Sequence, residues 1–127
     1  MARRKSSTFT EVELEFMQIV WDQGEVTTED MQAILHTQNR DLSDGSIRKI
    51  LSILIDKGHL ERRRDGRSFV YRAKENRDHA HRSIIQDILK RAFDNSASLL
   101  VAALLDTRKI TSKEIAEIKK LIKDHEE

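Results

Sequence analysis

The sequence predicts a mainly α protein with a small β-hairpin, and two observations carry most of that prediction. The chain of 127 residues contains no proline and four glycines, and 35% of its residues are charged, a composition that favours long helices joined by short connections. Apolar residues recur at helical spacing along most of the sequence, whereas the residues around Asp65 and Gly66 alternate in the manner of strands. With 38% apolar residues, the chain can supply the core of one ordinary domain or of a small domain with an appendage.

Two capped helices open the predicted fold. Thr10 and Glu13 form the sequence signature of a capping box, and apolar residues follow at helical spacing as far as residue 21. A second, shorter helix is predicted after the first, with Thr27 or Thr28 as its N-cap. Residues 25–26, between the two helices, can form a short strand.

A third helix is predicted from Ser43 to Gly58, with both ends marked. The Ser43 hydroxyl can accept a hydrogen bond from an amide of the first turn, and Gly58 suits the left-handed residue after the last turn. One stripe of the helix is apolar and must face a core: Ile47, Ile50, Leu51, Leu54 and Ile55. The outward residues are small or hydrogen-bonding and can approach DNA bases: Gly45, Ser46, Arg48, Lys49 and Ser52. The alternative for these outward residues is the solvated face of a core helix.

A β-hairpin is predicted to follow the third helix. Residues 59–63 and 68–72 flank the run Arg64-Asp65-Gly66-Arg67, and Asp-Gly between extended segments is a strong hairpin signal, so we expect both of these residues to adopt positive φ. Phe69 and Tyr71 should share one face of the ribbon, with the arginines of the turn reaching outward. The order helix, helix, helix, hairpin is that of a winged helix-turn-helix, in which the hairpin is the wing.

Charges are segregated along the chain, although the formal net charge is only +1. Residues 11–30 carry seven acidic residues and no lysine or arginine, whereas residues 57–74 carry seven basic residues and two acidic ones. A confined basic region is expected of a DNA-binding protein, because neutralising phosphate supplies most of the non-specific affinity. We expect the acidic segment to face away from DNA.

The arginines of the wing are candidates for contact with DNA phosphates. Arg62, Arg63 and Arg64 form a run, and Arg67 stands at the hairpin tip. The alternative is a solvated charged edge that discourages pairing with a strand of another chain. The position of Arg67 at the hairpin tip favours contact between this run and phosphate. Arg63, Arg64 and Arg67 are the wing residues predicted to belong to the DNA-binding site.

The C-terminal part of the chain is predicted to be an all-α dimerisation module. One helix includes residues 84–93, a second over residues 97–105 is apolar almost all round, and a third begins at Thr111 or Ser112. Roughly fifty residues cannot easily bury an apolar helix within one subunit, so a second copy of the chain is the predicted cover. The alternative is packing within the same subunit. The residues predicted to form the dimer interface are Ile84, Ile88, Leu100, Leu104, Ile115, Ile118 and Ile122.

Several classes of site are not supported by the sequence. There is no cysteine, which excludes disulfides and thiolate metal sites. His79 and His81 lie two residues apart, a spacing that fits a metal ion poorly, and both are expected to be solvated. No pair of residues offers a nucleophile and a base, so no enzyme activity, cofactor or metal is predicted. No apolar run reaches the ~18 residues of a membrane span, and no signal region follows the basic start, which predicts a cytoplasmic protein without membrane insertion.

Three segments resemble the penicillinase-repressor family of BlaI, MecI and CopY type. They are residues 11–21 with their terminal Trp21, the stretch from Ser43 to Gly58, and the Gly66-Arg67-Ser-Phe-Val-Tyr71 motif of the wing. The resemblance extends from about Thr10 to Lys123. It implies a homodimeric transcriptional repressor that occludes promoters by binding palindromic operators in double-stranded DNA.

The resemblance also implies roles for individual residues. Gly45, Ser46 and Lys49 correspond to positions where the recognition helix meets the bases, and Ser43 and Thr28 to positions near the DNA backbone. Relatives commonly carry a larger residue at position 45. We therefore expect this chain to read a different or looser operator.

The regulatory branches of the family have different implications for this chain. In the antibiotic-resistance branch, a partner membrane metalloprotease cleaves within the second helix of the dimerisation module, at a bond that aligns with Ala103–Leu104. The residues of that bond are not retained, so the resemblance leaves cleavage open. The copper-responsive branch senses metal through C-terminal cysteines, which this chain lacks.

The sequence thus predicts a flexible basic N-terminal arm at residues 1–9, a winged-helix DNA-binding domain at residues 10–75 and a helical dimerisation domain at residues 76–127. The expected function is sequence-specific repression by a homodimer, whose two-fold symmetry sets two half-sites about one DNA turn apart. The alternative is a winged-helix module that binds an acidic protein partner and has no specific DNA target.

Overall fold

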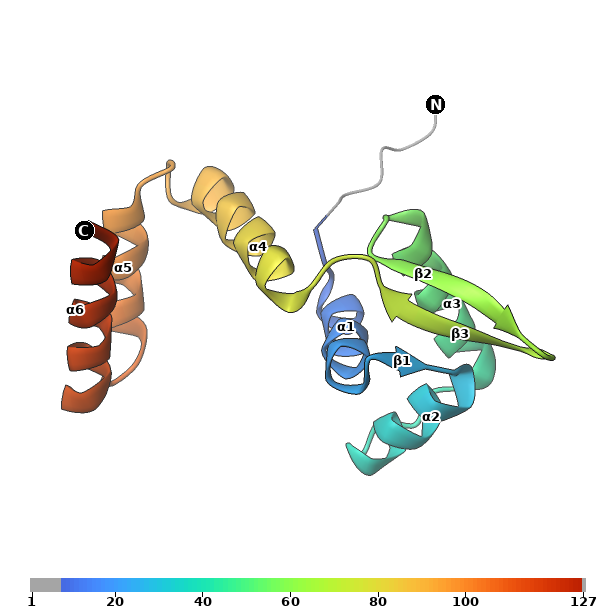
Figure 1. Cartoon of the computed structure of the whole chain (residues 1–127). Coiled ribbons are helices and arrows are strands. Elements are labelled where there is room, and N and C mark those ends of the chain that lie inside the picture. Colours follow the sequence, from blue (N-terminus) through green and yellow to red (C-terminus); the bar gives the residue numbers. More distant parts are fainter. Residues whose placement is uncertain (1–7, 127) are drawn as a thin grey trace. The chain divides into compact units, whose positions relative to one another are not determined.

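The computed structural model of the protein describes residues 8–126 (Figure 1). The predicted N-terminal arm lies outside the described residues except for Thr8 and Phe9. The chain divides into two compact units, residues 1–85 and residues 86–127.

Three helices of the first unit begin at the caps that the sequence predicts. They are α1 (Glu11–Gln23), α2 (Thr28–Thr37) and α3 (Asp44–Asp56). The capping box of α1 is present, with Thr10 Oγ1 accepting from the Glu13 amide at 3.1 Å and Glu13 Oε1 accepting from the Thr10 amide at 3.1 Å. Thr27, rather than Thr28, is the N-cap of α2, because its hydroxyl accepts from the Asp30 amide at 3.0 Å.

The end of α3 also follows the sequence prediction. The Ser43 hydroxyl accepts from the Ser46 amide at 3.1 Å, and the helix closes at Lys57. Gly58 then adopts a φ of 85°, a left-handed conformation that costs glycine little because it has no Cβ.

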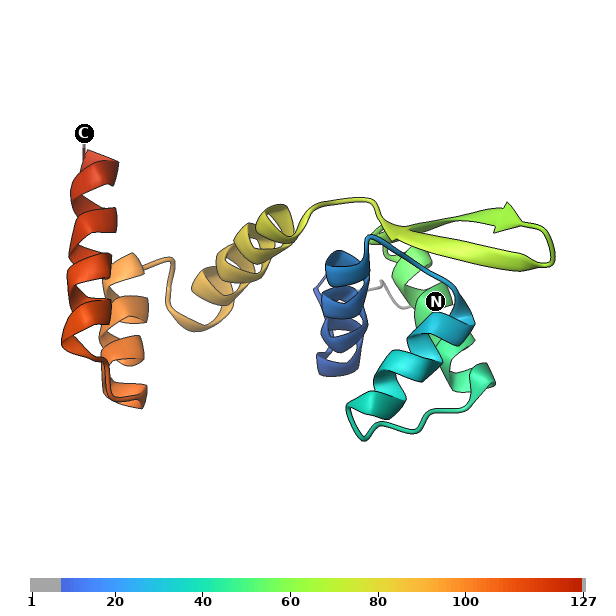
Figure 2. The same cartoon turned by 60° about the horizontal axis from the view of Figure 1, so that its bottom comes forward.

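A three-stranded antiparallel sheet completes the first unit. The strands are β1 (Glu25–Val26), β2 (Leu60–Asp65) and β3 (Ser68–Ala73), and their order in the sheet is β1-β3-β2. In both views the β2–β3 hairpin extends past the helices of this unit (Figures 1 and 2). The hairpin is the wing that the sequence predicts.

The turn of the wing differs from the prediction in its position. Asp65 pairs with Ser68 as the last residue of β2, which leaves Gly66 and Arg67 as the two loop residues. Gly66 has a φ of 64°, and neither Asp65 nor Arg67 has a positive φ. The prediction that both Asp65 and Gly66 have positive φ was therefore wrong. Glycine at the first loop position is the pattern of a type II′ turn, which needs positive φ only there.

The core of the first unit lies between the three helices and the sheet. The largest side chains with essentially no exposed surface are Phe16, Met17, Val20, Val26, Met31, Leu35, Ile47, Leu51, Leu54 and Leu60. Tyr71 of β3 is 4% exposed and belongs to the same cluster, so the base of the wing is anchored in this core. The tip of the wing carries no buried residue.

The helix α4 (Arg77–Ala92) begins within the first unit. The indole Nε1 of Trp21 donates to the carbonyl oxygen of Glu75 at 3.1 Å, and the Arg77 guanidinium pairs with Asp22 and lies 5.7 Å from the Trp21 ring centroid. Ala80, in the first turn of α4, is fully buried. The division between the units thus falls inside α4 rather than before it, because its first turns pack against α1.

The carboxylate of Glu75 also contacts two histidines. His59 Nδ1 lies 3.2 Å from Oε1, and His79 Nε2 lies 3.1 Å from Oε2. As predicted, both His79 and His81 are exposed. The side chain of His79 is 56% exposed, and the ring of His81 lies edge-on to the ring of Trp21. Among residues 8–126, no group of three or more histidines and carboxylates is placed to hold a metal ion.

The second unit contains the rest of α4, α5 (Ala97–Thr107) and α6 (Ser112–Glu126). The Ser96 hydroxyl caps α5 by accepting from the Leu99 amide at 3.1 Å, and the Thr111 hydroxyl accepts from the Glu114 amide at 3.1 Å at the start of α6. No residue described in α5 or α6 is buried. None of the helices within residues 8–126 has both the length and the apolar character that a membrane span requires.

Candidate nucleic-acid interface

The helix α3 presents a polar face whose position is fixed by its buried stripe. Ile47, Leu51 and Leu54 have no exposed surface, while Ile50 and Ile55 are half-buried. Because these residues anchor one side of the helix, the side chains on the other side project into solvent. The exposed candidates of the sequence prediction are Ser43, Gly45, Ser46, Arg48, Lys49 and Ser52.

Some polar groups on this face form hydrogen bonds or ion pairs within the protein, and others do not. The Ser43 hydroxyl caps the helix and donates to Ser46 Oγ at 3.0 Å. Arg48 Nε lies 2.8 Å from Asp44 Oδ2, in an exposed ion pair at helical i, i+4 spacing. Lys49 makes no ion pair with any residue in the described part of the chain. Lys49 is thus the cation on this face that is not neutralised internally.

The backbone at Gly45 does not require glycine. Its φ is not in the left-handed region, and a Cβ built there would meet no atom within 4 Å. The absence of a side chain at this position therefore affects the surface of α3, not its packing.

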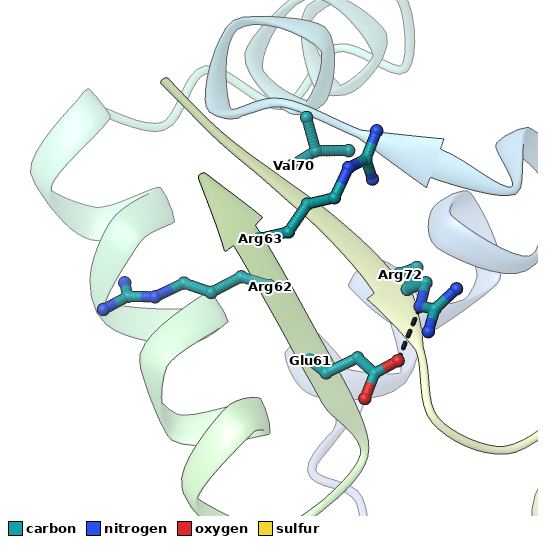
Figure 3. A pocket seen from close by; sticks show the side chains of 5 residues that line it. All are labelled: Glu61, Arg62, Arg63, Val70 and Arg72. Atoms are coloured by element: carbon teal, nitrogen blue, oxygen red, sulfur yellow. Dashed lines mark hydrogen bonds and ion pairs between the residues drawn. The ribbon is translucent and has the colours of Figure 1, made fainter. Parts of the chain in front are cut away.

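The wing has two faces with different charge environments. On one face, Arg63 pairs with Glu25 of β1, and Arg72 pairs with Glu61 across the hairpin. Close to these ion pairs is a cavity of about 310 Å³, which is lined by Glu61, Arg62, Arg63, Val70 and Arg72. Arg63 and Arg72 project from neighbouring strands, whereas the guanidinium of Arg62 points away from them (Figure 3). The structure therefore places Arg63 beside β1, where its charge is already paired.

The other face of the wing borders α3 and the start of α2. A cavity of about 190 Å³ lies there, and its lining combines predicted and unpredicted residues. The predicted site residues that it brings together are Thr28, Arg48 and Arg67. The remaining lining residues are Glu29, Arg62, Ser68, Phe69 and Tyr71. Arg64 lies near this face, with its Nε donating to the Gly66 carbonyl oxygen at 3.1 Å.

One member of the basic segment does not belong to the surface. Lys57 Nζ lies 2.7 Å from Glu13 Oε1 and donates to the Thr8 carbonyl oxygen at 3.0 Å, and the Lys57 and Glu13 side chains are only 9% and 8% exposed. Lys57 and Glu13 are far apart in the sequence, so the segregation of charge along the chain gave no sign of this pair. The other basic residues of this segment are exposed, and all of them except Lys74 lie on the wing.

The residues predicted for the dimer interface all lie on α4, α5 and α6. Several are largely exposed in the single chain, with Ile88 at 41%, Leu104 at 46% and Ile122 at 54%. The others are half-buried or only slightly more exposed: Ile84, Leu100, Ile115 and Ile118. The bond between Ala103 and Leu104 lies inside α5.

Comparison with known proteins relates most of the chain to one family. A sequence model described as "Penicillinase repressor" matches residues 9–124. The penicillinase repressor of Bacillus licheniformis is 24% identical over 122 residues, covering 96% of this chain and 94% of that protein. An uncharacterized 16.5 kDa protein from the ptsI 3′ region of Latilactobacillus sakei is 27% identical over 117 residues, covering 92% of this chain and 80% of that protein.

Two solved structures of DNA-binding regulators are similar to this chain. The DNA-binding domain of the repressor BlaI matches 59% of this chain and 90% of its own, with 28% sequence identity and a TM-score of 0.51. A mutant MarR from E. coli, solved with operator DNA, matches 91% of this chain and 74% of its own, with 17% identity and a TM-score of 0.50, a likeness of fold alone. The winged-helix fold class and the family resemblance predicted from the sequence are confirmed. The chain belongs to the penicillinase repressor family, whose members are transcriptional repressors rather than enzymes.

Proposed function

We propose that the protein is a homodimeric repressor that acts in the cytoplasm and occludes promoters by binding inverted-repeat operators. One observation carries the proposal: the exposed polar face of α3 lies on the same unit as wing arginines that have no carboxylate partner within residues 8–126. A helix face of this kind can enter the major groove, and unpaired arginines can neutralise the adjacent phosphates. The mutant MarR with which the chain shares its fold was solved with operator DNA.

Lys49, Ser46 and Ser52 are proposed to contact base edges, because they are exposed on α3 and carry hydrogen-bonding groups. Arg48 can join them only by leaving or sharing its ion pair with Asp44. The contacts proposed with the DNA backbone are made by Thr28, Ser43, Arg64 and Arg67.

The exposed apolar side chains of the second unit support the proposal of a homodimer. Leu99, Leu105 and Leu121 are 54%, 51% and 69% exposed, and they lie on the same short helices as the predicted interface residues. Three helices that bury almost nothing within their own chain need another apolar surface, because exposing this area to water costs free energy. A second copy of the same module is the cover that we propose, since a two-fold assembly also gives two copies of α3 a fixed spacing.

Release of the operator is proposed to follow from loss of the dimer. Cleavage between Ala103 and Leu104 by a membrane metalloprotease is one route, carried over from the family resemblance. The bond lies within a helix, so the surrounding turns of α5 must unwind before a protease can bind them in an extended form.

Selection of DNA fragments tests the DNA-binding function. Fragments of the organism's own promoters that are retained by the protein at physiological salt would be sequenced and footprinted, and we expect a protected inverted repeat. Lys49→Ala should weaken binding to the selected site more than binding to random duplex, whereas Lys113→Ala, at an exposed position on α6, should change neither. Retention of no DNA, with capture of an acidic protein partner instead, would favour the alternative of a protein-interaction module.

Replacing Arg64 and Arg67 together tests the wing assignment. We expect the double alanine variant to bind both specific and random duplex more weakly, and its salt dependence to be flatter by about two phosphate contacts. Equal dependence of the dissociation constant on salt for the wild type and the double variant would refute contact between these arginines and phosphates.

A further inference from the structure

We propose that Phe69 is a positioning residue for a phosphate seat, in which Arg62 is the anion-binding group that the wing contributes. The seat is the cavity between the wing, α3 and the start of α2. The proposal rests on the DNA-binding function proposed above, and it adds that Arg62, rather than its neighbour Arg63, meets a phosphate of the DNA backbone.

The strand pairing divides the run of three arginines between the two faces of the wing. Arg62 lies opposite Tyr71 and Arg64 opposite Phe69, whereas Arg63 lies opposite Val70. Because successive residues of a strand point to opposite faces, Arg62 and Arg64 share the face of the two aromatic residues. Figure 3 shows Arg62 and Arg63 projecting to opposite sides of β2.

Ion pairing makes the two faces electrostatically different. Arg63 is paired with Glu25, and Arg72 with Glu61, so the positive charges on that face are balanced within the protein. Arg62 has no carboxylate partner in the part of the chain that the structure describes. An anion that approaches the wing is therefore attracted more strongly to the face of Arg62 than to that of Arg63.

Phe69 holds the guanidinium of Arg62 in place without occupying its donors. Arg62 Cζ lies 4.1 Å from the centroid of the Phe69 ring, a cation–π distance, while Arg64 Cζ lies farther away at 5.8 Å. The ring is half-buried and packs against the core, so it provides a fixed surface. Stacking uses the face of the guanidinium and leaves the N–H groups at its edge free to bind phosphate oxygens.

The cavity beside Phe69 supplies further groups for an anion. Arg48 of α3 and Arg67 of the turn line it together with Arg62, and Thr28, which is 8% exposed, lies at its α2 side. The Thr28 hydroxyl forms no hydrogen bond within residues 8–126. Thr28 is also the first residue of α2, where the helix dipole favours negative charge.

One group in the lining opposes an anion. The carboxylate of Glu29 borders the same cavity, so three guanidinium groups face one carboxylate, and Arg48 shares its charge with Asp44. The balance remains positive, and Arg62 is the arginine of the three with both a fixed platform and no internal ion pair. The ligand that fits is a single phosphodiester group of the DNA backbone.

Four variants of the full chain test the seat, with a fluorescently labelled duplex of random sequence and the selected operator as probes. Arg62→Ala and Arg63→Ala remove the same charge from adjacent positions on opposite faces, so each is the matched control for the other. We expect Arg62→Ala to weaken binding to both probes by about fivefold or more and to lower the salt slope by about one, and Arg63→Ala to change either quantity far less.

Phe69→Leu and Phe69→Tyr test the positioning role, because neither changes the net charge. We expect Phe69→Leu to lower the salt slope nearly as much as Arg62→Ala, and Phe69→Tyr to retain the wild-type slope because its ring still supports the guanidinium. Thermal unfolding followed by circular dichroism identifies any variant that fails to fold. If Phe69→Leu is such a variant, the two arginine variants still decide whether Arg62, rather than Arg63, meets the phosphate.

The outcomes separate the seat from the function on which it rests. Equal losses for Arg62→Ala and Arg63→Ala would overturn the seat while leaving DNA binding in place. A wild-type slope for a folded Phe69→Leu variant would overturn the positioning role. Failure of the wild type to bind either duplex would overturn the proposed function and the seat together.

Discussion

Contacts between distant segments of this protein determine which basic side chains are available to bind DNA and which are paired internally. Lys57 stands in the basic segment of the sequence, but the fold buries it against Glu13 and the Thr8 carbonyl group. Arg63 stands in a run of three arginines, but only Arg63 is paired with Glu25. Both pairs join parts of the chain that local spacing cannot relate, so they could not be predicted from the sequence.

Lys57→Met should destabilise the first unit strongly. The variant keeps the length of the side chain but leaves the Glu13 carboxylate buried without a cation, and breaking a buried pair in this way typically costs about 3 kcal/mol. Urea unfolding would measure the loss, with Lys74→Met at an exposed position as the control. A second change, Glu13→Gln, should restore part of the stability, and no restoration would argue against an uncompensated charge as the cause.

The pKa of His36 should lie above the ordinary histidine value of 6.5. Its hydrogen bond to Asp41, at 2.6 Å, raises the pKa of His36, and the charge of Asp41 adds to that effect. A raised pKa in the folded state means that the contact stabilises the fold fully below the ordinary pKa of about 6.5 and that this contribution is lost as the pH rises through the raised value. Titration by NMR would show the shift, and Asp41→Asn should remove it. An unchanged His36 pKa in that variant would contradict the assignment.

At the scale of elements, most boundaries could be predicted because their signals are local. Thr10, Ser43 and Gly58 mark helix ends through contacts within a few residues, and the structure confirms all three. The turn of the wing was misplaced by one position because Asp65 has a cross-strand partner in Ser68 and continues β2. Pairing between strands, rather than the preference of the Asp-Gly pair itself, determined where the loop begins.

Gly66→Ala should weaken the wing, whereas Gly45→Ala should not. Neither substitution would place a Cβ within 4 Å of another atom, but Gly66 has a φ of 64° and Gly45 lies in a helix. A left-handed conformation costs an alanine about 1 kcal/mol, while alanine is favoured over glycine within a helix. Thermal unfolding of the two variants should therefore shift in opposite directions. Equal shifts would show that the conformation of Gly66 is not the source of the loss.

The candidate site could be predicted only in part at this scale. The exposed face of α3 followed from its apolar stripe, and the structure leaves Ser46, Lys49 and Ser52 in solvent. The division of the wing into a paired and an unpaired face depends on β1, a two-residue strand whose Glu25 neutralises Arg63. No periodicity within the wing itself could reveal that contact.

At the scale of the whole molecule, the two units differ in how much of their apolar surface they bury within the chain. The first unit encloses a core of fully buried side chains, whereas α5 and α6 bury none of their own. The sequence pattern predicted this difference, because an apolar helix without a polar face cannot be covered by a short segment. The proposed dimer accounts for the exposed leucines and isoleucines of the second unit.

Leu104→Asp should convert the proposed dimer to monomers. Leu104 is 46% exposed on α5, and a carboxylate buried there between two copies would lack a partner. Sedimentation would measure the mass of the variant. We expect its operator affinity to be lower than that of the wild type, because the two copies of α3 are no longer linked. Gln18→Asp, exposed on α1, adds the same charge to the first unit and should leave the mass unchanged. An intact dimer of Leu104→Asp would contradict the assignment of this surface.

The most direct measurement is the number of chains bound to the selected operator, obtained by native mass spectrometry of the complex. The proposed function predicts two chains on one duplex that carries an inverted repeat with half-sites about one helical turn apart. Inserting about five base pairs between the half-sites places the two half-sites on opposite sides of the duplex. The proposed function predicts that the second chain then no longer binds cooperatively. A single chain bound to a site without a repeat, unaffected by the insertion, would contradict the account of this protein as a homodimeric operator-binding repressor.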